Sequence, residues 1–126
     1  MVERAQVMAL PLNLPVRFIT GDAANPDFAA GTFDVALVRH VVWALPNHER
    51  ALRRWLALLK SGSRLIAIEG RWGSGGIPAT DLIAALTPLY DQIEIHSLSD
   101  DADLWGKAVD DERYAVVAMR PRTQTK

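Results

Sequence analysis

The sequence contains no cysteine, which excludes disulfides, iron–sulfur clusters and zinc sites built on thiolates. Long hydrophobic runs are also lacking, because the apolar stretches fall far short of the roughly 20 residues that cross a bilayer. Positive and negative charges nearly cancel, with a formal net charge of −1, so no overall field attracts nucleic acid or an anionic membrane. These absences favour a cytoplasmic protein that binds neither nucleic acid nor membrane.

The composition is that of an ordinary globular protein. Hydrophobic residues make up 49% and charged residues 23% of the 126 residues, which is enough for one compact core and hardly enough for two. The polar end at residues 121–126 includes Pro121 and is expected to be a tail. We therefore expect a single domain over residues 1–120.

Hydrophobic spacing predicts an alternation of helices and strands. Helical spacing occurs at residues 1–12, from Asn47 as N-cap to about Lys60, where Ser61-Gly62 would end the helix, and after Thr80 as N-cap. Apolar or alternating segments predict strands at Val16–Thr20, Phe33–Val38, Arg64–Glu69, Ile93–Leu98 and Tyr114–Met119. This order indicates an α/β fold with a mostly parallel sheet covered on both faces, ending in an antiparallel strand pair.

Several segments, in this order and spacing, resemble class I S-adenosylmethionine-dependent methyltransferases of the small-molecule type. The likeness runs from Val16 to Arg120 and is carried by VRFITGDA, GTFDVALVRHVVWAL, ALRRWLALLKSGSRLIAIEGRW and DERYAVVAMRP. The family usually has Pro-Gly-Gly where this chain has Lys60-Ser61-Gly62-Ser63. The resemblance implies a Rossmann-like fold and S-adenosylmethionine as the cofactor.

The resemblance also implies an N-terminally truncated, partial methyltransferase fold. The family orders its strands 3-2-1-4-5-7-6, and this chain has no counterpart of strand 1, its glycine-rich loop, or strand 2 with its terminal acidic residue. Those glycines let the backbone approach the cofactor, and the acidic residue binds the ribose hydroxyls. By itself the chain is therefore expected to bind S-adenosylmethionine weakly or not at all.

A sheet without those strands has an exposed edge. Strand Val16–Thr20 would lose its neighbours, and strand Phe33–Val38 would be open on one side. We expect Val16–Thr20 to collapse beside Phe33–Val38, to pair with another chain or to be loosely held. Unpaired edges invite pairing with another chain. We expect a homodimer, a complementing chain or aggregation, and a well-behaved monomer would count against this interpretation.

Gly21-Asp22-Ala23 follows the first expected strand. In the family, the acid at the position of Asp22 receives the adenine amino group, and the backbone N–H at the position of Ala23 meets the ring. The resemblance thus implies that Asp22 and Ala23 bind the cofactor. The alternative is a plain turn in which Asp22 caps the backbone.

Arg39, His40 and Trp43 follow the strand Phe33–Val38, where open α/β sheets bind ligands. By the resemblance, Arg39 binds the cofactor at its methionine end, Arg39 and His40 flank the reacting centre, and Trp43 lies on the substrate side. His40 could act as a general base, because the ordinary pKa of histidine lies near neutrality. The alternative is that His40 and Trp43 only pack the loop.

Glu69, Arg71 and Trp72 leave the next strand at the same rim. They continue into a loop with four glycines, which lacks the G-x-G-x-x-G and Walker patterns of phosphate binding. These three residues are candidates for the substrate side of the site. The alternative is a simple connector.

Other charged groups carry no specific motif. The acids between Asp100 and Glu112 lack the spacing of a calcium loop, and His48 and His96 are isolated, so no metal site is expected. The Asn-Pro-Pro-aromatic signature of enzymes that methylate nucleic-acid amino groups is absent, which favours a small-molecule substrate. Two hypotheses remain: methyl transfer to a small molecule, or a non-catalytic remnant that serves as an interaction module.

Overall fold

The computed structural model describes residues 15–99 and 111–122. The helix expected at residues 1–12, the acidic segment 100–110 and the end of the tail lie outside the described residues. The elements in chain order are β1 (Phe33–Arg39), the 3-10 helix η2 (Val42–Ala44), α2 (His48–Leu58), β2 (Leu59–Trp72), β3 (Gly75–Gly76), α3 (Ala79–Leu86), β4 (Asp91–Ser97) and β5 (Glu112–Met119).

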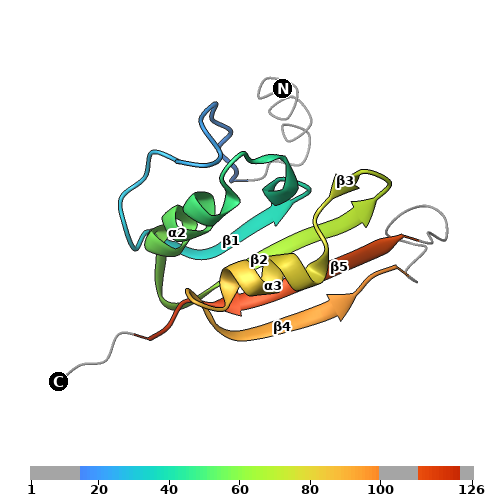
Figure 1. Ribbon diagram of the computed structural model, residues 1–126. Coiled ribbons are helices and arrows are strands. Elements are labelled where there is room, and N and C mark those ends of the chain that lie inside the picture. Colours follow the sequence, from blue (N-terminus) through green and yellow to red (C-terminus); the bar gives the residue numbers. More distant parts are fainter. Residues whose placement is uncertain (1–14, 100–110, 123–126) are drawn as a thin grey trace.

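The strands form a mixed sheet in the order β1-β2-β5-β4, with β3 attached to β2 (Figure 1). β1 and β2 are parallel, whereas β5 is antiparallel to both β2 and β4. The α/β class and the closing antiparallel pair are confirmed. Within the described residues, the only parallel pair is β1 with β2, so the sheet is less parallel than expected.

Helix α2 forms as the sequence indicates. The Asn47 side chain accepts a hydrogen bond from the Arg50 N–H at 3.1 Å and so caps the first turn. The buried face of the helix consists of Ala51, Leu52, Trp55 and Leu58. The chain then passes directly into β2 at Leu59, so Ser61 and Gly62 lie in the strand and do not end the helix.

Helix α3 begins earlier than expected. Its N-cap is Pro78, and Thr80 lies inside the first turn. Proline suits the start of a helix because the first backbone N–H groups have no partner within the helix. After α3, the Tyr90 hydroxyl donates to the Leu52 carbonyl at 2.9 Å, which joins the two helices.

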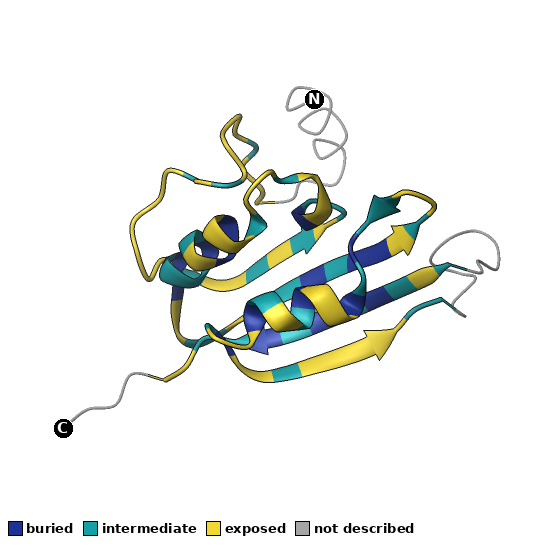
Figure 2. Ribbon diagram, in the orientation of Figure 1, coloured by how far each residue is buried: buried dark blue, intermediate teal, exposed yellow. Residues whose placement is uncertain are grey.

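Both helices lie on the same face of the sheet (Figure 1), and the core forms between them and the strands. Leu52, Leu65, Leu82 and Leu86 are completely buried, and burial of each such side chain contributes about 1.5–3 kcal/mol. Figure 2 shows this buried layer along β2 and β5 and mostly exposed residues along β4. No described helix covers the opposite face, so the expectation of cover on both faces is wrong for this part of the chain.

The strand expected at Val16–Thr20 is absent: residues 15–22 have no regular structure. Val16 and Ile19 are 49% and 56% exposed. A strand needs a neighbour that satisfies its backbone hydrogen bonds, and no described strand lies next to this segment. The apolar, β-branched composition was therefore insufficient to form a strand.

Candidate functional site

The carboxyl ends of β1 and β2 meet at one edge of the sheet because the two strands are parallel. The backbone N–H of His40 donates to the Ile68 carbonyl at 2.9 Å and extends this pairing by one residue. The chain then turns sharply, since His40 adopts a φ of +55°, a left-handed conformation that is uncommon for residues other than glycine. The loop after β1 therefore holds His40 in a constrained position.

A buried carboxylate fastens this loop. Glu69 on β2 is 0% exposed, and its Oε1 accepts the backbone N–H groups of Val41 and Val42 at 3.0 and 2.8 Å. Oε2 is also buried and has no hydrogen-bond partner among the described residues. Glu69 was expected on the substrate side, but the structure places it beneath the loop.

Burial raises the pKa of Glu69, and the hydrogen bonds from Val42 and Val41 oppose this rise only in part. The raised pKa means that the folded chain holds the proton more tightly than the unfolded chain does. This contribution to stability is complete below the ordinary value of 4.5 and is lost as pH rises through the raised pKa.

We therefore expect wild-type stability to fall, relative to a Glu69→Gln variant, as pH rises from 4.5 through the raised pKa of Glu69. The slope cannot exceed about 1.4 kcal/mol per pH unit for one group. Urea unfolding of both proteins at closely spaced pH values measures the difference, in which the contributions of other groups cancel. Parallel pH profiles would contradict the buried position of this carboxylate.

Aromatic and basic side chains gather above the clamped loop. The ring of Trp72 lies 4.8 Å from that of His40 and 5.6 Å from that of Trp43, measured between centroids. The Arg113 guanidinium lies 5.2 Å from the Trp72 ring, within the range of a cation–π contact. We call His40, Trp43, Trp72 and Arg113 the rim cluster.

The surroundings of His40 favour the neutral imidazole, which can accept a proton. Burial lowers the pKa of His40, and the positive charges of Arg39 and Arg113 lower it further. The imidazole is consequently neutral at neutral pH, as a general base must be. The Trp43 indole N–H donates to the His40 carbonyl at 3.1 Å and thus supports the same turn.

Arg71 and the glycines after it form a tight hairpin instead of a flexible loop. β2 continues to Trp72, the chain turns, and Gly75–Gly76 pairs back onto Arg71 and Trp72. Arg71 is exposed, and so is Arg39. Of the predicted rim residues, the structure brings His40, Trp43 and Trp72 into mutual contact and leaves the Arg71 side chain outside that group.

The loop with Asp22 and Ala23 lies against α2. Asp22 Oδ1 accepts the Ala24 N–H at 2.9 Å, so Asp22 does cap its own turn. The Trp55 indole N–H donates to the Ala23 carbonyl at 2.7 Å. Arg54 secures the following residues by donating to Asn25, Pro26 and Phe28 at 2.9–3.0 Å.

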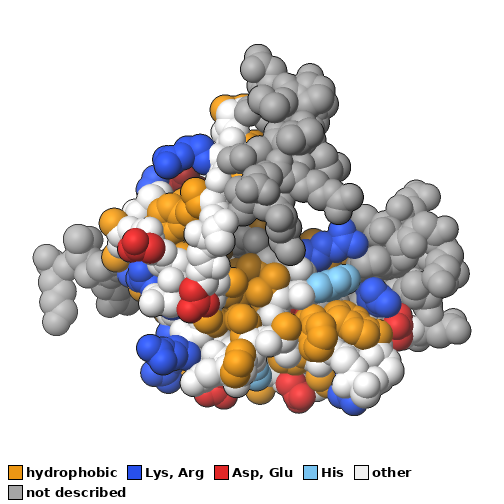
Figure 3. Space-filling model, turned by 90° about the horizontal axis from the view of Figure 1, so that it is seen from above, with side chains coloured by type: hydrophobic (Ala, Val, Ile, Leu, Met, Phe, Trp, Pro, Cys, Tyr) orange, Lys and Arg blue, Asp and Glu red, His pale blue; other side chains and the backbone are white. Residues whose placement is uncertain are grey.

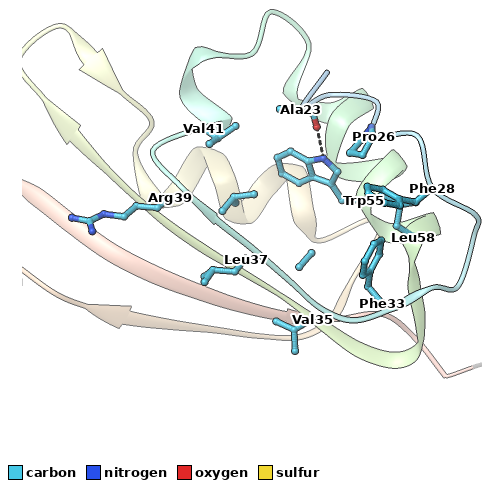
Figure 4. A pocket seen from close by; sticks show the side chains of 12 residues that line it. Ala23, Pro26, Phe28, Phe33, Val35, Leu37, Arg39, Val41, Trp55 and Leu58 are labelled. Carbon is cyan, nitrogen blue, oxygen red and sulfur yellow. Dashed lines mark hydrogen bonds between the residues drawn. The ribbon is translucent and has the colours of Figure 1, made fainter. Parts of the chain in front are cut away.

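A groove of about 390 Å³ separates this loop from β1 (Figure 4). Ala23 lies on one wall, and Arg39 and Val41 lie on the other. The Asp22–Ala23 turn also borders a second hollow of about 330 Å³. The two parts of the expected cofactor site, the turn and the end of β1, thus face a shared opening.

The residues present fit part of S-adenosylmethionine. A carboxylate has two acceptor oxygens, so the capping bond of Asp22 leaves one for an adenine amino group. The groove next to the turn is largely apolar, as a site for a flat base would be. The glycines after Trp72 belong to the hairpin with β3 and do not line this groove, so the fit among the described residues ends with the adenine.

Sequence patterns missed one residue of the site, Arg113, and the role of another, Glu69. Arg113 reaches Trp72 because β5 is antiparallel to β2, with Gly70 opposite Arg113; Asp111 holds its guanidinium at 2.9 and 3.1 Å. The segment Asp111-Glu112-Arg113 was the available signal for a charged residue at the start of a strand, but the strand that pairs with it was unknown. Glu69 was selected from the sequence, but its clamping role was not, because that role depends on the loop folding over it.

Residues 15–99 and 111–122 contain no cluster of three or more histidine or acidic side chains placed to hold a metal ion. Within the same residues, every helix is too short or too polar to span a bilayer. Figure 3 shows that hydrophobic side chains lie next to a histidine and basic groups on the surface.

Sequence comparison finds a methyltransferase domain at residues 1–67. The ubiquinone/menaquinone biosynthesis C-methyltransferase UbiE of Klebsiella pneumoniae is 28% identical over 105 residues, which cover 83% of this chain and 39% of that protein. The chain therefore spans about two-fifths of the length of the curated relatives it matches.

Structural comparison finds the same fold. The [4+2]-cyclase SpnF has a TM-score of 0.73 at 19% identity, covering 98% of this chain and 64% of that one. The N-methyltransferase NodS of Bradyrhizobium japonicum, solved with S-adenosylhomocysteine, has a TM-score of 0.68 at 20% identity and coverages of 94% and 63%. The chain belongs to the methyltransferase domain family and has the Rossmann-like fold of the S-adenosylmethionine-dependent enzymes.

Proposed function

We propose that this chain takes part in the transfer of a methyl group from S-adenosylmethionine to a small-molecule acceptor. The observation that supports this most directly is the position of His40 at the carboxyl ends of β1 and β2. His40 lies between Arg39 and Val41, which line the groove that also reaches Ala23. Membership of the methyltransferase family supports the assignment of S-adenosylmethionine as the cofactor. The acceptor has to be identified by experiment, since one structural relative, SpnF, is a [4+2]-cyclase.

The chain's own residues have separate roles in this proposal. S-adenosylmethionine would supply an electrophilic methyl group on a sulfonium. Asp22 and Ala23 would bind its adenine, and Trp43 and Trp72 would offer apolar surface to an acceptor and exclude water from it. His40, neutral at neutral pH, would take the proton of an acceptor hydroxyl or amine, while Glu69 keeps the loop in place.

Cofactor binding by the chain alone is expected to be too weak to saturate at micromolar concentrations. Each absent hydrogen bond to a charged group is worth about 1.5–3 kcal/mol, or roughly 10–100-fold in affinity. Calorimetric titration with S-adenosylhomocysteine measures this directly. Adding a polypeptide with a D-x-G-x-G-x-G strand–turn–helix should restore micromolar binding, and Asp22→Ala should then weaken it about tenfold.

The controls separate the two candidate functions. Micromolar binding by the chain alone would show that the assignment of the cofactor site is wrong. No binding by the mixture, with both polypeptides folded, would instead favour a non-catalytic interaction module. The open groove on β1 is the observation that favours this second candidate.

A further inference from the structure

The indole of Trp43 is the exposed aromatic surface of the rim cluster. Trp43 is 42% exposed, whereas Trp72 and His40 are each half-buried. The position of the indole is fixed, because its N–H donates to the His40 carbonyl and its ring packs against Trp72 at an interplanar angle of 83°. A rigid indole at the surface offers a stacking platform to a planar ligand at little cost in entropy.

Two arginines project from the same face of the sheet as Trp72. Arg39 pairs with Ile68, and Arg113 pairs with Gly70. Residues 68, 70 and 72 of β2 alternate on one face of the strand, so their partners point to that face as well. The bare Gly70 leaves room there, since a Cβ atom would lie 3.0 Å from Arg113 Cδ and 3.2 Å from the Trp72 ring.

The charge around His40 is positive. Arg39 and Arg113 both lower the pKa of His40, and no carboxylate is among the causes of this shift. Asp111 binds Arg113 at 2.9 and 3.1 Å and orients its guanidinium. Glu69 points to the other face of β2, and its raised pKa favours the neutral form. Figure 3 shows basic groups next to a histidine on the surface.

This charge decides which planar ligand suits the rim cluster. Aromatic side chains alone would also suit a quaternary ammonium group, which binds over ring faces. The guanidinium groups of Arg39 and Arg113 repel such a cation. They favour a carboxylate, which accepts parallel hydrogen bonds from a guanidinium.

We propose that the rim cluster and Arg39 together bind an aromatic carboxylate as the methyl acceptor, with its ring on the Trp43 indole and its carboxylate towards Arg39 and Arg113. A ring at this place lies beside His40, because the Trp43 indole is bonded to the His40 carbonyl. The inference deepens the proposed function and rests on it for the role of the bound acid. Binding of the acid needs no cofactor, so it can be measured on the chain alone.

Para-hydroxybenzoate is a suitable probe, and para-hydroxybenzamide is its matched neutral control. In an NMR titration of the isotope-labelled chain, para-hydroxybenzoate should shift the indole N–H signals of Trp43 and Trp72 with a millimolar dissociation constant, as expected for so small a ligand. The amide should bind about tenfold more weakly, and benzyltrimethylammonium should give no saturable shift. The signal of Trp55, which lines the groove assigned to the cofactor, should not move.

Variants separate the contribution of charge from that of stacking. Arg39→Gln and Arg113→Gln should each weaken binding of para-hydroxybenzoate about tenfold and change binding of the amide little. Trp43→Leu should weaken both probes alike, by roughly threefold or more. The control is Arg64→Gln, an exposed arginine on the same face in the other half of β2, which should bind like wild type.

Circular dichroism establishes that each variant is folded. Arg39→Gln carries the test by itself if Arg113→Gln unfolds through loss of the bond to Asp111. Equal affinity for the acid and the amide would overturn the proposal. So would a shift of the Trp55 signal in place of the Trp43 signal, because it would place the probe in the cofactor groove.

The proposed function fails in a different way. Absence of S-adenosylhomocysteine binding in the complemented complex would overturn methyl transfer, and with it the role of the acid as acceptor, even where the probe binds. Binding of S-adenosylhomocysteine by that complex without binding of para-hydroxybenzoate would overturn this inference alone.

Discussion

Replacing Gly76 with alanine is expected to destabilise the fold by about 3 kcal/mol or more. A Cβ atom at Gly76 would lie 2.0 Å from the Gly70 carbonyl oxygen and 2.9 Å from the Arg71 Cα. Both obstacles are backbone atoms of β2, which cannot rotate away as a side chain could. Gly76 also has a φ of +89°, which adds strain for any residue with a Cβ.

The hairpin provides its own control. Gly73 has a φ of +56°, but a Cβ there would meet no atom within 4 Å. Gly73→Ala therefore isolates the conformational cost, about 1–2 kcal/mol. Urea unfolding followed by tryptophan fluorescence compares the two variants. Equal unfolding midpoints would mean that the close approach of Gly76 to β2 does not occur in solution.

The Gly76 contact also supports the core and the rim cluster. Next to it, the Ile77 N–H donates to the Gly70 carbonyl at 2.8 Å, and the Ile77 carbonyl accepts from the buried Tyr114 hydroxyl at 2.7 Å. A shift of the hairpin would disturb both bonds and move Trp72. We thus expect Gly76→Ala to alter the tryptophan emission even in conditions where the chain stays folded.

Glu69→Ala is expected to lower the free energy of unfolding by about 2–4 kcal/mol. It leaves the N–H groups of Val41 and Val42 without their acceptor, and each buried donor without a partner costs roughly 1–3 kcal/mol. Relief from burying the carboxylate offsets part of this loss. A small domain has only about 5–15 kcal/mol of stability, so this variant is expected to be marginal.

The conservative variant keeps this prediction testable. Glu69→Gln retains an acceptor oxygen and should cost less than half as much as alanine, while Glu94→Ala, a surface carboxylate on β4, should change stability by less than about 0.5 kcal/mol. Amide hydrogen exchange gives a local readout, because Val41 and Val42 should lose protection selectively in the alanine variant. Uniform loss across the sheet would contradict a local clamp.

Local signals in the sequence located most elements correctly. Asn47 caps α2 as expected, and the apolar segments around Phe33, Arg64, Ile93 and Tyr114 all lie in strands. These elements depend on side-chain spacing and capping, which act over a few neighbouring residues. At the rim, His40, Trp43 and Trp72 lie together because the ends of parallel strands converge, whereas Glu69 lies beneath the loop and Arg71 outside the group. The roles of these residues in binding and catalysis stay predictions.

Other features could not be derived from local pattern. Val16–Thr20 has the composition of a strand, yet it forms no strand. Strand formation requires a pairing partner, and local sequence does not encode that partner. Glu69 looked like a rim residue, but the loop of Val41 and Val42 covers it. The glycines after Trp72 looked flexible, whereas close backbone contact with β2 makes Gly76 necessary.

The sequence by itself determined the α/β class, the family and the approximate positions of the main helices and strands, because short-range spacing and recurring motifs encode them. Only the tertiary structure decided which carboxylate is buried and which arginine reaches Trp72. The physical reason is that burial and strand pairing join residues far apart in the chain: Glu69 binds backbone 27 and 28 positions away.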